Sequence, residues 1–192
     1  MKKAIVIALA VILLASCAKK ETSNKDGFET DATENAGTFA QSADEYIENA
    51  YAYFENEDFD KAIVNYTEAI RLVPDSELLY YNRGIAYRNI DDYNKAIADF
   101  TEAIMLNPNF VEAYIYRSTT YLEKQDINKA IENYTEAIKQ NPNVAGLYYN
   151  RGLTYLFDKN DYDNAIADFE AALKIEPDYK ETIEQAKKAW RN

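Results

Sequence analysis

The sequence lacks several residues on which enzymes and metal sites most often depend. It contains no histidine, which is the commonest general base and metal ligand in proteins. Its single cysteine excludes an intrachain disulfide. Glycine occurs only 5 times, and no glycine-rich phosphate loop is present. We therefore predict that the protein is not an enzyme and that it uses no cofactor and no metal ion.

Positive charge is also scarce. Lys and Arg total 21 against 33 Asp and Glu, which gives a formal net charge of −12. A chain this acidic repels polyanions, which argues against a nucleic-acid partner. With 192 residues, 47% of them hydrophobic and 28% charged, the chain has the composition of a folded protein with a sizeable core.

The single cysteine, Cys17, follows a short apolar segment. Two lysines at positions 2 and 3 precede an apolar run over 4–15, which is shorter than the roughly 20 residues that span a bilayer. This arrangement is typical of a signal peptide. The residues LASC at 14–17 resemble the bacterial lipobox, which implies cleavage after residue 16 and a diacylglycerol on the Cys17 sulfur. Alternative interpretations are a secreted protein cut near Ala15, with Cys17 incidental, and an uncleaved anchor.

Residues 17–42 are predicted to form a tether behind this lipid anchor. They are rich in Lys, Thr, Ser, Asn, Asp and Glu, and they hold too few apolar residues to form a core. Two acyl chains on one residue give stable membrane anchoring. In a bacterium with two membranes, the lipobox resemblance and the Ala18 that follows the cysteine imply transport to the outer membrane.

The rest of the chain is periodic. The four prolines lie at positions 74, 108, 142 and 177, and a period of this length indicates a repeat array. In the segments 43–76, 77–110, 111–144 and 145–179, aromatic residues recur at the fourth, eleventh and twenty-fourth places, and alanine at the twentieth and twenty-seventh. The eighth place holds a small residue in each segment: Ala50, Gly84, Ser118 and Gly152. Large rings opposite small residues predict one closely packed helical hairpin per repeat.

Each repeat also carries signals for the ends of its helices. An Asx residue stands just before each second helix, where we expect it to cap the free amides: Asp60, Asn94, Asn128 and Asp163. The prolines follow the second helices and end them. The fourth repeat has one extra residue within 158–161, which we place in the turn between its two helices.

This pattern resembles the tetratricopeptide repeat. The resemblance implies an all-α solenoid of four helix–turn–helix repeats over 43–179, in which the first helix of each repeat lines a concave groove and the second forms the convex back. The segment 180–192 corresponds to the family's capping helix, with Ile183, Ala186 and Trp190 on one face.

The resemblance also implies which residues face the groove, namely those at the second, fifth, ninth and twelfth places of each repeat. Most of them are apolar or aromatic, which favours a protein or peptide partner. An alternative is that neighbouring helices, the tether or a second copy of the chain, as in a homo-oligomer, cover some of them. The positions are Asp44, Ile47, Tyr51 and Phe54; Leu78, Tyr81, Ile85 and Arg88; Glu112, Ile115, Thr119 and Leu122; Gly146, Tyr149, Leu153 and Leu156, with Phe157 adjacent.

Two repeats share the letters YYNRG, at 80–84 and 148–152. Their arginines, Arg83 and Arg151, occur in the same repeats that have aspartate at the twenty-third place, Asp99 and Asp168. We therefore predict one Arg–Asp pair inside each of these hairpins, with ligand binding by the arginines as the alternative.

The resulting functional hypothesis is a membrane-anchored scaffold or adaptor in the bacterial cell envelope that binds other proteins through an apolar, tyrosine-rich groove. The alternative is an accessory component of a solute transport system that binds a small lipophilic ligand. Tetratricopeptide domains that clamp a terminal carboxylate need cationic groups that are missing here, and only Asn82 matches their pattern.

Overall fold

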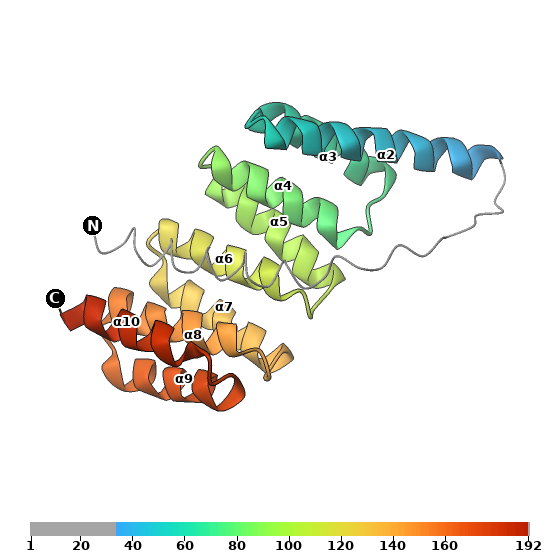
Figure 1. Cartoon of the computed structure of the whole chain (residues 1–192). Helices are drawn as coiled ribbons and strands as arrows, with labels where there is room; N and C mark the ends of the chain where they lie inside the picture. Colours follow the sequence, from blue (N-terminus) through green and yellow to red (C-terminus); the bar gives the residue numbers. More distant parts are fainter. Residues whose placement is uncertain (1–33, 192) are drawn as a thin grey trace. The chain divides into compact units, whose positions relative to one another are not determined.

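The computed structural model describes residues 34–191, and the side chains of residues 43–190. The predicted signal peptide, Cys17 and residues 17–33 of the tether lie outside the described residues. Within this part the chain forms nine α-helices, one π-helical segment and no strand, which confirms the all-α class (Figure 1). No helix among the described residues is long and apolar enough to cross a membrane.

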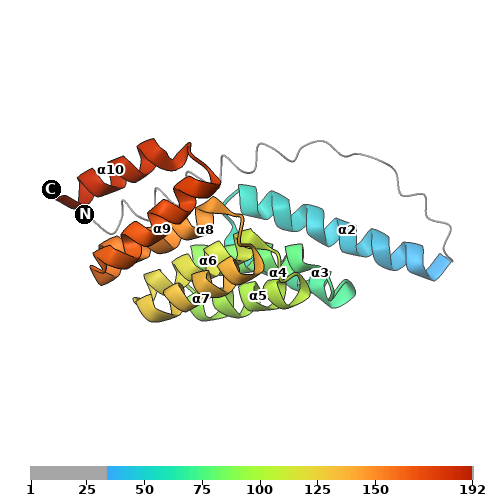
Figure 2. The same ribbon diagram turned by 90° about the horizontal axis from the view of Figure 1, so that it is seen from below.

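The described chain forms two compact units, residues 34–120 and 121–191, and helix α6 crosses their boundary. In each unit the predicted repeats appear as pairs of helices packed side by side, such as α2 with α3 and α4 with α5 (Figures 1 and 2). The elements are α2 (Glu34–Glu55), α3 (Phe59–Leu72), α4 (Glu77–Asn89), α5 (Tyr93–Leu106), α6 (Val111–Glu123), α7 (Ile127–Gln140), α8 (Ala145–Leu153), the π-helix η2 (Thr154–Lys159), α9 (Tyr162–Ile175) and α10 (Tyr179–Arg191).

The first helix begins earlier than the sequence indicates. Helix α2 starts at Glu34, so residues 34–42, which we predicted as the end of a flexible tether, are helical. From residue 43 onward α2 packs against α3, with Ala43 and Ala50 buried. An ongoing helix extends readily into a polar segment because each added residue forms one more backbone hydrogen bond, without a new nucleation step.

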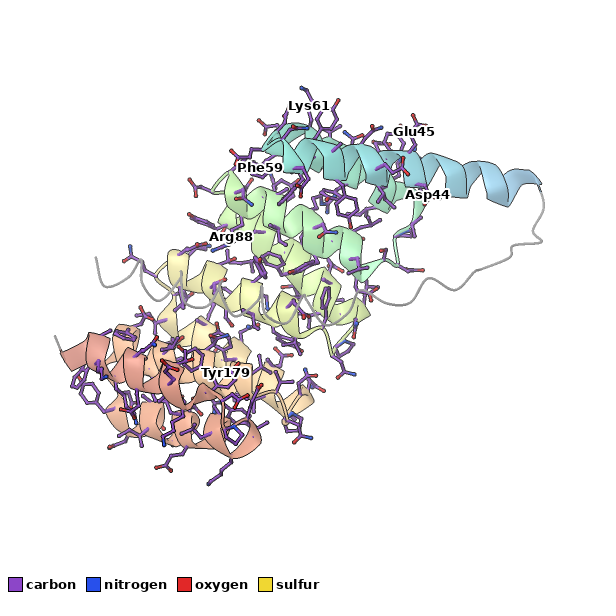
Figure 3. The ribbon with its side chains drawn as sticks, viewed as in Figure 1. Asp44, Glu45, Phe59, Lys61, Arg88 and Tyr179 are labelled. Atoms are coloured by element: carbon purple, nitrogen blue, oxygen red, sulfur yellow. The ribbon has the colours of Figure 1, made fainter. Side chains whose placement is uncertain are left out.

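The helix caps lie two residues before the predicted positions. Helices α3, α5, α7 and α9 are capped by Asp58, Asp92, Asp126 and Asp161, whose carboxylates accept a hydrogen bond from the backbone N–H three residues on. In the first three, the residue that donates this N–H is a lysine, whose ammonium also pairs with the cap at 2.7 to 2.9 Å. Lys61 is the first of these lysines (Figure 3). The proposed caps, Asp60, Asn94, Asn128 and Asp163, lie inside the first turn instead.

The extra residue of the fourth repeat does not lengthen the turn. It is absorbed by η2 at the end of the first helix, where the Asp161 N–H donates to the Tyr155 carbonyl at 2.9 Å. In the second repeat the corresponding Asp92 N–H donates to Tyr87, one residue closer in sequence. A single π-type turn is a common way to accept one inserted residue without changing the rest of a helix.

Small residues at the eighth place make the hairpins close, as predicted. A Cβ added at Gly84 would lie 2.7 Å from the ring of Phe100, and one added at Gly152 would lie 2.8 Å from the ring of Phe169. Both rings are buried. Glycine is therefore required here by the approach of the ring from the second helix.

Helix α10 closes the 121–191 unit. Ile183 and Ala186 are fully buried in a cluster with Tyr149, Leu153 and Phe169. Trp190 is half-buried, and its ring lies 4.4 Å from that of Tyr162, centroid to centroid. The predicted capping helix and its apolar face are confirmed.

Candidate partner-binding surfaces

The most exposed apolar side chains at predicted inward positions lie on α2 and α4. Leu78 is 53% exposed and Tyr51 is 47% exposed. The Asn82 amide donates to the Tyr51 hydroxyl at 2.9 Å, which ties the two helices together at this point. Half-buried Ile47, Phe54 and Ile85 also lie on these helices. We call this set the α2–α4 surface.

Tyr81 lies within an aromatic cluster of the same unit. Its ring is 4.8 Å from that of Phe110, 5.5 Å from that of Tyr116 and 6.1 Å from that of Phe100. Burial, and then the neighbouring Tyr116 and Glu112, raise the pKa of the Tyr81 hydroxyl well above its ordinary value. Tyr81 therefore remains a neutral phenol that contributes half-buried ring surface rather than charge.

Arg88 is the only cation among the predicted inward positions. It is half-buried, and its guanidinium lies 5.6 Å from the centroid of the Tyr116 ring, a cation–π contact. On α2, by contrast, Asp44 and Glu48 are exposed carboxylates. The α2–α4 surface thus combines exposed apolar side chains with negative charge.

Five residues that we predicted to line an open groove are buried, so the prediction is wrong for them. Tyr149, Leu153 and Leu156 lie in the core of the 121–191 unit, where α10 covers them and the Tyr179 ring stands 5.2 Å from that of Tyr149. Ile115 and Thr119 are each 6% exposed. Leu122 and Phe157 are half-buried.

The two predicted Arg–Asp pairs are confirmed. Arg83 donates to both oxygens of Asp99, from Nε at 2.7 Å and from Nη2 at 2.8 Å. Arg151 binds Asp168 in the same bidentate way, at 2.8 and 2.7 Å. Burial raises the pKa of the Asp99 carboxyl, and the Arg83 guanidinium opposes this shift. The pairs are structural elements of the hairpins, since each guanidinium is occupied by a partly buried carboxylate.

Sequence reasoning missed a further contact, which Arg83 and Arg151 make in common with Arg117 of the third repeat. Each arginine also donates, through Nη1, to a threonine of the preceding repeat: Arg83 to Thr67 at 3.1 Å, Arg117 to Thr101 at 3.0 Å and Arg151 to Thr135 at 2.9 Å. The sequence does carry a signal for this contact. A threonine recurs at the same place in the first three repeats, in NYTEAI, DFTEAI and NYTEAI, and the fourth repeat has DFEAAL. In the fourth repeat, which helix α10 follows, Glu170 stands in place of this threonine.

The described residues contain no group of three or more potential metal ligands. The exposed groups of the α2–α4 surface and its surroundings are rings, aliphatic side chains and carboxylates. They offer a partner apolar contact area together with negative charge.

Comparison with protein families agrees with this architecture of helical hairpins joined by arginine contacts. The fold defines a helical repeat protein. A family model described as TPR repeat matches residues 50–91 and 119–156, and two models described as tetratricopeptide repeat match residues 78–110 and 145–179. Together they match more than half of the chain, and the chain belongs to the tetratricopeptide repeat family.

Solved structures with similar folds include three of particular relevance. MamA is 27% identical, with a TM-score of 0.64 over 72% of this chain and 81% of its own. A tetratricopeptide repeat protein from Parabacteroides merdae is 26% identical, with a TM-score of 0.64 over 71% of this chain and 54% of its own. The TPR2B domain of yeast Sti1, in complex with pHsp70, is 29% identical, with a TM-score of 0.51 over 66% of this chain and 98% of its own. Comparison with curated proteins gives no significant match.

Proposed function

We propose that the protein is a lipid-anchored scaffold or adaptor of the bacterial cell envelope that binds a protein partner through the α2–α4 surface. The observation that carries this proposal is the exposure of Tyr51 and Leu78 on a hairpin array whose other large inward side chains are half-buried or buried. Exposed apolar groups gathered on one face usually mark an interaction site.

The chemistry of this surface suits a polypeptide. Tyrosine contributes a large contact area at a low cost in conformational entropy, and it is enriched among residues that dominate binding energies. Asn82 holds the Tyr51 side chain through its hydroxyl, so less ordering is needed when a partner binds. The similar Sti1 domain, solved with pHsp70, offers a precedent for a protein ligand on this fold.

A site-specific photo-crosslinker tests the surface directly. We would place p-benzoylphenylalanine at Leu78 in the full chain, in its native cells, and compare it with the same residue at Met105 of α5. Met105 is the matched control because it is an apolar side chain on a second helix and is 67% exposed. We expect a defined covalent adduct at position 78, and we expect Tyr51→Ala to lower the yield of this adduct at least severalfold. Equal adducts at both positions, or none at position 78, would contradict the proposal.

The proposed anchor depends on the Cys17 sulfur. We expect Cys17→Ser to leave unprocessed precursor without acylated mature protein, since the serine hydroxyl cannot replace the thiol as the lipid acceptor. Mass spectrometry of the membrane fraction measures this. Normal processing of the mutant chain to a membrane-anchored mature form would show that the lipobox assignment is wrong.

A further inference from the structure

A solvent-open pocket of about 230 Å³ lies between α9, η2 and α10, within the 121–191 unit. Its walls are formed by Leu156, Tyr162, Ala165, Ile166, Phe169, Lys187 and Trp190. Leu156, Ala165 and Phe169 are buried and form its base, whereas Tyr162 and Ile166 are 38% and 48% exposed. The pocket is separate from the α2–α4 surface and does not depend on the proposed function.

Comparison with the other repeats shows why this pocket exists. Ile63, Ile97 and Ile131 occupy the place that corresponds to Ile166, and all three are half-buried or buried. One turn further along each of these helices is the threonine that accepts a hydrogen bond from an arginine of the next repeat. In each of the first three repeats, this face of the second helix is therefore covered by the repeat that follows.

In the fourth repeat that cover is incomplete. The threonine is replaced by Glu170, which is exposed, and α10 takes the place of a following repeat. Helix α10 reaches the start of α9 through Trp190, whose ring contacts that of Tyr162. Between this contact and the buried base, Ile166 remains open to solvent.

The size of the remaining space selects a small molecule. The volume of about 230 Å³ suits a small molecule rather than a whole α-helix, which is about 10 Å across with its side chains. An engineered apolar cavity of about 150 Å³ accommodates benzene, so 230 Å³ accommodates a molecule of roughly ten non-hydrogen atoms.

The lining selects an amphiphile with an acidic group. All the side chains of the pocket except Lys187 are apolar or aromatic. The Lys187 ammonium pairs with Glu184 at 3.2 Å, and the two side chains are 34% and 55% exposed. Such an exposed pair is weak, so the ammonium can turn toward a ligand carboxylate at little cost.

We propose that the α9–α10 pocket binds a small aromatic or aliphatic carboxylate, with the apolar part between Ile166 and Trp190 and the carboxylate at Lys187. Trp190 is the only tryptophan of the chain, so its fluorescence reports on this pocket alone. The proposal can therefore be tested on the full chain without a label.

The probe is 4-phenylbutyrate, which hardly absorbs at the red edge of tryptophan excitation, and its uncharged match is 4-phenylbutan-1-ol. We expect saturable quenching or a spectral shift of Trp190 with 4-phenylbutyrate, with a Kd on the order of 1 mM or below. Ile166→Glu, at an exposed position, should weaken binding about tenfold or more. Lys187→Gln should weaken the binding of 4-phenylbutyrate severalfold and leave the binding of 4-phenylbutan-1-ol unchanged.

Met105→Glu is the matched control, because it places the same charge on an exposed apolar position of α5 in the other unit. It should bind 4-phenylbutyrate like the unaltered chain. The proposal is overturned by non-saturable quenching, by equal binding to Ile166→Glu, or by equal losses in both glutamate variants. It is also overturned if sedimentation shows that Ile166→Glu dissociates a dimer, because this face then contacts a second copy of the chain.

Discussion

The bidentate pair between Arg83 and Asp99 allows a quantitative test of the hairpin architecture. The change is Asp99→Asn, which reproduces what the third repeat has naturally, where Arg117 occurs with Asn133. The carboxylate accepts two charged hydrogen bonds, at 2.7 and 2.8 Å, and the side chains of Arg83 and Asp99 are 16% and 7% exposed. An asparagine keeps one acceptor oxygen and removes the negative charge.

Two opposing effects set the magnitude. A hydrogen bond to a charged group contributes about 1.5 to 3 kcal/mol to stability, and Asp99→Asn loses one such bond together with the charge. Burial, which raises the pKa of Asp99, shows that ionisation of this carboxyl carries a desolvation cost, and that cost disappears in the variant. We therefore expect the free energy of unfolding to fall by about 1 to 2 kcal/mol.

The assay is urea unfolding followed by circular dichroism, with the cycle completed by Arg83→Met and the double variant. Methionine keeps the apolar part of the arginine chain, and Thr67→Val measures the separate loss of the Arg83–Thr67 bond. We expect a coupling energy between roughly 0.5 and 3 kcal/mol. Effects that add to within about 0.5 kcal/mol, or an Asp99→Asn variant as stable as the control Glu170→Gln, would refute the reasoning.

Three further changes test the packing, the inter-repeat contacts and the caps by the same assay. Gly84→Ala should destabilise the protein by about 1 to 3 kcal/mol, because its Cβ would lie 2.7 Å from the buried Phe100 ring; wild-type stability would contradict the close approach. Thr101→Val should cost about 1 kcal/mol by removing the 3.0 Å bond from Arg117, and no change would show that this contact does not stabilise the array. Asp92→Asn tests a carboxyl whose pKa a neighbouring lysine lowers. Because the stability from that shift is present above pH ~3.9 and lost as pH falls, the variant should lose less stability on acidification than the unaltered chain, and parallel pH profiles would count against it.

Features that repeat within the chain could be predicted from the sequence. Arg83 with Asp99 and Arg151 with Asp168 occur together in two repeats, and Gly84 faces the same ring position as Gly152. Each of these interactions lies within one hairpin, so the 34-residue register alone places both partners.

The helix caps show where a local signal is ambiguous. At the start of every second helix two Asx residues stand two positions apart, and the one that caps is the first of them, Asp58, Asp92, Asp126 or Asp161. A residue in a left-handed conformation immediately precedes each cap, with φ between 55° and 61°, and fixes where the helix begins. None of these residues is a glycine, and their left-handed conformation follows from the packing of the hairpin. The sequence alone therefore does not indicate where that conformation occurs.

Burial of the groove positions could not be read from the repeats themselves. Tyr81 and Tyr149 belong to identical pentapeptides, but Tyr81 is half-buried beside Phe110 and Tyr116, whereas Tyr149 is fully buried beside Tyr179. The difference comes from the segment that follows each repeat. The groove register, which comes from the internal repeats, does not predict that helix α10 buries Tyr149.

This difference leads to a prediction of opposite sign for the two tyrosines. The Tyr149 hydroxyl is buried without a hydrogen-bond partner among the described residues, whereas Tyr81 forms a side-chain hydrogen bond with Tyr116. A buried, unpaired hydroxyl costs about 1 to 3 kcal/mol, and its removal leaves the ring contacts with Phe169 and Tyr179 in place. At neutral pH, Tyr149→Phe should therefore raise the free energy of unfolding by about 1 kcal/mol, and Tyr81→Phe should lower it by a similar amount.

The gain from Tyr149→Phe should increase in alkaline solution. Burial, together with Tyr179, raises the pKa of Tyr149 to about 12, against roughly 10 for an unfolded tyrosine. The unfolded chain therefore ionises first, and the stability contributed by the neutral phenol is present below pH ~10 and lost as pH rises toward 12. Phenylalanine has no such loss, so the advantage of the variant should grow by up to about 2 to 3 kcal/mol over this range, measured as urea midpoints at increasing pH. A variant that is less stable than the unaltered chain at neutral pH, or whose advantage stays constant with pH, would show that the Tyr149 hydroxyl reaches a partner or solvent and that α10 does not seal this position.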